Sequence, residues 1–467
     1  MHKNRFAIIV GLLALLASTL ACSLPIAGQD EGATPGEIAT AVAATLAAAG
    51  PAQPPLVLPT LIPDEPTPTP GLDLPPTPTP TPPVSLTLAY RDGAGNLWAW
   101  IEGGSPRQLT SSGDVGYDLA VSSDGVWIAF TRHVDDPPTH SLWAIRSAGA
   151  GERELVSAKN FADWKGGLDV RTAVTAKIAW ASGTHTLVFT TQALVEYGMV
   201  LNYDLRTVDA DTGALTEVLP IGAGGMFTLS PDGRQVALAT PNALHLMNLD
   251  GTNLRSNVIN YANVMTYSEY AYHLQPVWAA DSSRLRVHIP PADPLASPRQ
   301  ATTLWNVPAD GSPAQQTGSV DVFFLDTVLF APAGETLLVV RPAGDPTTSN
   351  DREMVLSGVD GGGALRLDGG EFTSAAWSPD GRRFSYLRNP GGIALYGQPD
   401  SGSVAPLTDT ANVQEVLWVD ANRFFFSSRA SDSTRQIRLG TPGGASQLVA
   451  EVSGLESYDW VAMDFNR

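Results

Sequence analysis

The sequence has a single cysteine, Cys22, in 467 residues. One cysteine excludes an internal disulfide, so a fold of this size has to be stabilised by its hydrophobic core. Cations are also scarce, because 28 Lys and Arg stand against 47 Asp and Glu, and the formal charge is -19. Nucleic-acid binding needs a basic surface, so this composition argues against a nucleic-acid partner. It also argues against attachment of the domain surface itself to anionic lipids.

The apolar run at residues 6–20 is too short for a transmembrane helix, which needs roughly 20 residues. Because it follows Lys3 and Arg5, we interpret it as an export signal. Residues 19–22, Thr-Leu-Ala-Cys, resemble the lipoprotein signal of bacteria, in which the cysteine is lipidated and becomes the mature N-terminus. The resemblance implies a signal peptide over residues 1–21, a lipid on Cys22 and an extracytoplasmic protein anchored to the cell membrane. An ordinary export signal or an uncleaved anchor, with Cys22 incidental, is the alternative.

Residues 22–84 lack a sustained apolar pattern, being Ala-rich at first and rich in Pro and Thr between residues 51 and 83. Proline fixes φ near polyproline values and removes a backbone donor, which favours an extended, semi-rigid chain. We therefore predict a disordered linker over residues 22–84, followed by one domain over residues 85–467.

That domain repeats with a period of roughly 40–60 residues. Each unit has a large apolar residue before a turn such as Ser-Pro-Asp-Gly at residues 378–381, then an apolar strand, a further strand, a Gly-containing turn and a last short strand. The large apolar residues define a column in the alignment of the units: Val121, Trp180, Leu229, Trp278, Phe330, Trp377, Trp418 and Trp460. Four short antiparallel strands per repeated unit predict an all-β fold, a β-propeller with eight four-stranded blades, or seven if the less regular units are merged.

The two ends of the domain predict how the ring closes. Residues 86–110 supply three strands of a blade without its first strand, and residues 457–464, centred on Trp460, supply a first strand with nothing after it. Pairing these segments would complete a blade and remove two exposed sheet edges. We therefore expect the C-terminal strand to be innermost in the first blade, with Trp460 buried.

The units at residues 122–125, 230–233 and 378–381 resemble the WD40-like (PD40) repeat of TolB-type propellers, in which an aromatic residue precedes Ser-Pro-Asp-Gly and an apolar strand follows. The resemblance implies the fold, since the motif is a turn and packing device, and carries no specific activity with it.

Sequence signals for catalysis and for metal binding are weak. Prolyl-oligopeptidase-like enzymes need a further domain with a Gly-x-Ser-x-Gly elbow, which we do not find. His133, Asp135 and His140 could supply two imidazoles and a carboxylate to a metal ion, but a polar hairpin stiffened by prolines explains the same residues. We therefore expect no cofactor and assign no metal site or catalytic residue.

Extra length falls in connections that share one face of a propeller, the strand 2–3 loops and the blade-to-blade loops: residues 133–140, 158–174, 260–273, 290–301, 319–326 and 342–352. Loops on a rigid scaffold commonly carry binding residues, and aromatic rings give large contact areas. The predicted ligand-binding residues are the aromatic ones in these insertions: Phe161, Trp164, Tyr261, Tyr267, Tyr270, Tyr272, Phe323 and Phe324. The alternative for each ring is that it folds back to anchor its loop.

The sequence therefore favours a non-enzymatic, monomeric, lipid-anchored propeller that binds a protein or an envelope glycan. The alternative is a propeller-type hydrolase or lyase acting on glycans from the central channel, which for a glycosidase requires two carboxylates about 5–9.5 Å apart.

Overall fold

The computed structural model describes residues 84–467 apart from 136–137, 166–170, 197, 325, 333–334, 346–350 and 457–458, and these described residues belong to one compact unit. The predicted signal peptide, Cys22 and the linker up to residue 83 lie outside the described residues. No helix in the described part of the chain has the length and apolar character needed to cross a membrane.

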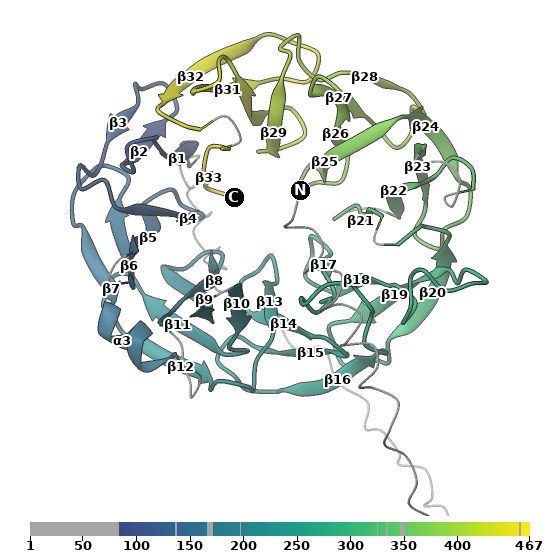
Figure 1. Cartoon of the computed structure of the whole chain (residues 1–467), viewed down its shortest axis with the longest axis horizontal. Coiled ribbons are helices and arrows are strands. Elements are labelled where there is room, and N and C mark those ends of the chain that lie inside the picture. The colour runs from purple at the N-terminus through teal and green to yellow at the C-terminus, as the bar shows by residue number, and fades with distance from the viewer. Residues whose placement is uncertain are drawn as a thin grey trace, which may run out of the picture. The chain divides into compact units, whose positions relative to one another are not determined.

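The unit is an eight-bladed β-propeller, with eight antiparallel sheets arranged in a ring around a common centre (Figure 1). This confirms the predicted fold class and selects eight blades over seven. In each blade one strand lies at the centre of the ring and the last strand lies at its rim (Figure 1). We number the blades from the one that contains the first strand.

The strands are given from the centre outward. Blade 1 comprises β33 (Met463–Phe465), β1 (Thr87–Arg91), β2 (Leu97–Ile101) and β3 (Arg107–Gln108). Blade 2 comprises β4 (Val115–Val121), β5 (Trp127–Asp135), β6 (Pro138–Arg146) and β7 (Arg153–Val156). Blade 3 comprises β8 (Thr172–Trp180), β9 (Thr186–Val195), β11 (Leu205–Asp209) and β12 (Leu215–Leu219), with β10 (Gly198–Leu201) added along the end of β9. Blade 4 comprises β13 (Met226–Leu229), β14 (Gln235–Thr240), β15 (Ala243–Asn248) and β16 (Arg255–Asn260).

Blade 5 comprises β17 (Val277–Trp278), β18 (Arg284–Ile289), β19 (Thr302–Pro308) and β20 (Gln315–Val320). Blade 6 comprises β21 (Val328–Phe330), β22 (Thr336–Pro342), β23 (Arg352–Gly358) and β24 (Leu365–Gly369). Blade 7 comprises β25 (Glu371–Trp377), β26 (Phe384–Asn389), β27 (Ile393–Gly397) and β28 (Val404–Pro406). Blade 8 comprises β29 (Val413–Trp418), β30 (Phe424–Arg429), β31 (Thr434–Gly440) and β32 (Ser446–Ser453), and one helix, α3 (Ala158–Asp163), connects blades 2 and 3.

The Ser-Pro-Asp-Gly turn is held by its own side chains. Ser378 Oγ accepts the backbone N–H of Arg383 at 3.0 Å and donates to Asp380 Oδ1 at 2.7 Å. Gly381 has φ of 66°, a conformation that side-chain-bearing residues rarely adopt. Ser378, Asp380 and Gly381 therefore each have a local structural task, which explains why the motif predicts the fold and not an activity.

Neighbouring blades are joined by the tryptophans of the column. The indole N–H of Trp377 donates to the carbonyl of Leu329 in the preceding blade at 3.1 Å. The same bond recurs from Trp180 to Ala120 at 3.0 Å and from Trp278 to Thr228 at 3.2 Å. In all three cases the acceptor is the residue before the column residue of the preceding blade. Each of the three indole N–H groups therefore has a hydrogen-bond acceptor in the preceding blade.

A second inter-blade contact centres on His185, in the β8–β9 turn of blade 3. Its Nε2 lies 2.8 Å from Asp124 Oδ2 of blade 2, and its Nδ1 lies 2.6 Å from Asp211 Oδ2 of blade 3. Burial lowers the pKa of His185, but the two carboxylates outweigh burial and raise it overall. Hydrogen bonding to His185 in turn lowers the pKa of Asp211.

Ring closure occurs where the sequence predicts it, since β33 pairs antiparallel with β1 and completes blade 1. Asn466, the residue after β33, accepts the backbone N–H of Thr87 at 2.7 Å and donates its own N–H to the Thr87 carbonyl at 3.2 Å. Ser230 makes the equivalent pair of hydrogen bonds with Gln235 inside blade 4. Its hydroxyl accepts the Gln235 N–H, and its own N–H donates to the Gln235 carbonyl. Asn466 thus takes the place of the turn serine, with the two sides of the turn supplied by opposite ends of the domain.

The predicted register of this closing strand was wrong. The strand is Met463–Phe465 and not residues 457–464, and Trp460 is 61% exposed, with its ring near Tyr117. Phe465, which is 1% exposed, is the true column residue, because it directly precedes the turn residue Asn466. The error arose because Phe465 is followed by Asn466 and not by Ser-Pro-Asp-Gly, so the turn motif that marks the column in other blades is missing.

Candidate binding site

A cavity of about 1310 Å³ lies against the inner strands of blades 3 to 6. Its walls include residues of β8, β13, β17 and β21, which are the innermost strands of these four consecutive blades. The cavity therefore lies on the central side of the ring, where Figure 1 shows these strands following one another along its inner side from β8 to β21.

Connections between strands build the rim of the cavity. The 4–5 connection contributes residues 266 and 268–276, the β18–β19 loop contributes Pro290, and the 5–6 connection contributes Val322, Phe324 and residues 326–327. Three of the six predicted insertions thus meet at one site. A further insertion was missed by sequence reasoning: β10, placed between the second and third strands of blade 3, adds Met199, Val200 and Leu201.

Three of the predicted ligand-binding residues, Tyr270, Tyr272 and Phe324, line the cavity. Tyr270 is 55% exposed, and its hydroxyl lies beside Gly198 of β10, so the 4–5 connection reaches blade 3. Tyr267 does not line the cavity, but its ring lies 6.2 Å from that of Phe324 and its hydroxyl donates to Asp293 at 2.7 Å. The structure therefore brings four of the eight predicted rings to the same site.

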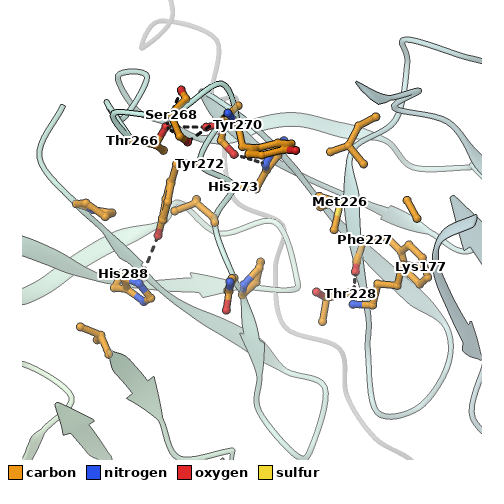
Figure 2. Close-up of a pocket in the computed structure, with 18 of the residues that line it drawn as sticks. Lys177, Met226, Phe227, Thr228, Thr266, Ser268, Tyr270, Tyr272, His273 and His288 are labelled. Atoms are coloured by element: carbon orange, nitrogen blue, oxygen red, sulfur yellow. Dashed lines mark hydrogen bonds between the residues drawn. The ribbon is translucent and has the colours of Figure 1, made fainter. Parts of the chain in front are cut away.

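Two Tyr–His pairs stand in the cavity wall. The hydroxyl of Tyr272 lies 3.3 Å from Nε2 of His288, as the dashed line in Figure 2 shows, and that of Tyr203 lies 3.0 Å from Nε2 of His273. His273 Nδ1 lies 3.1 Å from the carbonyl of Ala271, so Nδ1 carries the proton and Nε2 accepts from Tyr203. Burial lowers the pKa of His288 to about 4 and also lowers that of His273. Both imidazoles are therefore neutral at pH 7.

Lys177 of β8 is the cation in the cavity lining. Its Nζ donates to the carbonyl of Phe227 in blade 4 at 2.8 Å and lies 5.0 Å from the centre of that ring (Figure 2). Burial lowers the pKa of Lys177. Sequence reasoning did not single out this residue, although it is the one charged side chain in the strand Thr172–Trp180.

The carboxylates of the lining are Glu269 and Asp326. Glu269 lies on the exposed 4–5 connection. Asp326 is part-buried, and burial raises its pKa, although the ion pair with Arg352 at 3.1 Å opposes that effect. Phe323, another predicted binding residue, is part-buried beneath the same Arg352 guanidinium, which lies 5.7 Å from its ring centre.

The remaining predicted rings lie elsewhere. Tyr261 is part-buried against the core between blades 4 and 5, and burial raises its pKa to about 12. Phe161 of α3 is fully buried in the core between blades 2 and 3, so its prediction as a ligand contact was wrong. Trp164 packs against Phe161 with its ring 4.0 Å below the Arg206 guanidinium. The helix explains the burial, since Phe161 is the residue that α3 buries, and a capping box between Ser157 and Asn160 stabilises the start of that helix.

The weak metal candidates form a cross-strand pair. His133 of β5 faces His140 of β6, with ring centres 5.9 Å apart, while the side chain of Asp135 lies outside the described residues. His140 is buried, which lowers its pKa to about 3, and its Nε2 accepts the backbone N–H of Thr175 at 3.2 Å. Among the side chains that the structure describes, no cluster of three or more His, Cys, Asp or Glu could hold a metal ion.

No protein-family model and no curated protein matches this sequence. Similar solved structures include an oligogalacturonate lyase in complex with manganese, which is 13% identical with a TM-score of 0.45 over 76% of this chain and 96% of that chain. A eukaryotic initiation factor is 10% identical with a TM-score of 0.48 over 80% of this chain and 100% of that chain. TolB from Acinetobacter baumannii is 13% identical with a TM-score of 0.32 over 59% and 62%. These similarities concern the fold alone.

Proposed function

We propose that this chain is an extracytoplasmic binding protein, anchored to the membrane by a lipid on Cys22, which uses the cavity of its propeller to hold a protein or glycan of the cell envelope. The observation that carries the proposal is the meeting of several insertions at one cavity whose rim bears aromatic rings. Ligand sites in proteins are commonly concave, mostly apolar and supplied with a few polar groups. This cavity has those properties.

Capture of partners by the full-length chain in detergent micelles tests the proposal. The Tyr270→Ala variant should lose a partner that the wild type retains from an envelope extract, because an exposed ring at the rim supplies contact area. Tyr117→Ala is the matched control, since Tyr117 is 52% exposed and lies outside the cavity lining. Equal retention by the wild type and Tyr270→Ala, or equal losses from the two variants, would contradict the proposal.

The second candidate is a hydrolase or lyase acting on glycans, and the part-buried carboxyl group of Asp326 in the cavity lining favours it. General acid–base catalysis needs a carboxyl group positioned at the substrate, and burial raises the pKa of this one, while the ion pair with Arg352 opposes that effect. Turnover on a panel of glycans, abolished in Asp326→Asn and retained in Asp321→Asn, would support this function. Asp321 is a suitable control because it lies in the same connection but pairs with Arg299 at the surface.

A further inference from the structure

The ammonium group of Lys177 has unused hydrogen-bonding capacity. Of its three N–H donors, one bonds the carbonyl of Phe227. No carboxylate of the described residues lies within 4.0 Å of Lys177 Nζ, so this ammonium forms no ion pair with the described residues. A part-buried cation that keeps two free donors is costly to desolvate, unless water or an anion from outside occupies the space beside it.

The charges around the cavity make this ammonium distinctive. His273 and His288 are neutral at pH 7 because burial lowers their pKa values, and Asp326 is engaged by Arg352. Glu269 is exposed on the 4–5 connection and forms no ion pair with Lys177. Lys177 is therefore the positive group of a lining that also includes apolar residues such as Met226 and Val277.

We propose that the cavity takes a ligand with a single carboxylate attached to an apolar body, and that Lys177 binds the carboxylate. This inference rests on the proposed binding function and specifies the chemistry of the ligand. One ammonium balances one negative charge. A phosphate monoester carries about -1.5 to -2 at pH 7, more than this site neutralises, so a carboxylate fits better. The apolar body would pack against side chains of blades 4 and 5.

Isothermal titration calorimetry of the full-length chain in detergent micelles tests the proposal, with 4-phenylbutyrate as the probe. Its amide, 4-phenylbutyramide, has the same apolar body without the charge and should bind roughly tenfold to a hundredfold more weakly, the effect expected for a lost charge-assisted hydrogen bond. Lys177→Met should weaken binding of the carboxylate by the same factor and leave binding of the amide unchanged. Lys177→Arg should restore much of the loss, because it keeps the positive charge.

Lys159→Met is the control, since Lys159 is an exposed lysine of α3 with 82% of its side chain accessible, and it should bind like the wild type. Melting curves of every variant separate loss of the site from loss of folding. Failure of the carboxylate to bind at millimolar concentration, equal binding of the amide, or unchanged affinity in a folded Lys177→Met variant would overturn the proposal. If the carboxylate proposal is overturned but Tyr270→Ala still abolishes partner capture, the proposed binding function stands and only the proposed chemistry of the ligand is lost. If the carboxylate binds but Tyr270→Ala captures normally, the proposed function fails instead.

Discussion

Replacing Phe465 by Ala tests how the ring closes. Phe465 is 1% exposed and belongs to the core shared by blades 8 and 1, where its ring lies 5.5 Å from that of Phe425. Truncating such a buried ring removes its contacts and leaves a cavity, at a typical cost of about 3–5 kcal/mol in the free energy of unfolding. Stabilities of whole domains are about 5–15 kcal/mol, so the loss would be a large fraction of the total.

Trp460→Ala is the matched comparison, because it removes a larger ring only five positions away. With 61% of Trp460 exposed, we expect a change within about 0.5 kcal/mol. Asn466→Ala should fall between the two, at about 1–3 kcal/mol, since the Thr87 N–H would lose its acceptor. Urea unfolding followed by far-UV circular dichroism measures all three without relying on tryptophan fluorescence. An equal loss from Trp460→Ala and Phe465→Ala would refute the closing register.

Three more outcomes can be measured. Trp377→Phe should lower the free energy of unfolding in urea by about 1 kcal/mol, because the carbonyl of Leu329 loses its donor. Trp305→Phe should cost less, because the indole of Trp305 bonds within its own strand. Equal losses from the two variants would count against the inter-blade bond. The stability difference between the wild type and His185→Gln should be largest between about pH 4 and 6.5. The stability difference should shrink above that window, as pH rises through the raised pKa of the imidazole. It should also shrink below the window, as the partner carboxylates with lowered pKa values are protonated. A stability difference that does not change with pH would contradict the contact. Cys22→Ala should move the protein from the membrane fraction to the soluble fraction, and unchanged fractionation would exclude lipidation as the anchor.

The fold was predictable because its signals are local and repeated. Three of the turns carry a serine, an aspartate and a glycine in fixed order, at residues 122–125, 230–233 and 378–381, and each inner strand ends in a large apolar residue. The closing strand was predictable as a missing partner, but its register was not. Asn466 substitutes for the turn serine, and the rest of its turn comes from the other end of the domain, so no local motif marked Phe465.

The site was predictable only as a region. Insertions on one face of the ring marked the connections that meet at the cavity, and Tyr270, Tyr272 and Phe324 line it. Phe161 was misassigned, since a capped helix buries a ring that the sequence places in a long connection. Lys177 was missed because nothing in a nine-residue strand shows whether a lysine points to solvent or into a cavity.

The turn shared by Thr87 and Asn466 also bears on the time course of folding. The two residues are 379 positions apart, so blade 1 cannot be completed until β33 and Asn466 have been synthesised. At about 5–20 residues per second, β1 would wait roughly 20–75 s for its partner strand. Contacts between distant residues are slow to form even in the finished chain, since a long loop has to close first. During that interval the inner edge of β1 is an unpaired strand edge, and other chains can associate with such edges. We therefore expect blade 1 to be the blade that most needs a chaperone during synthesis.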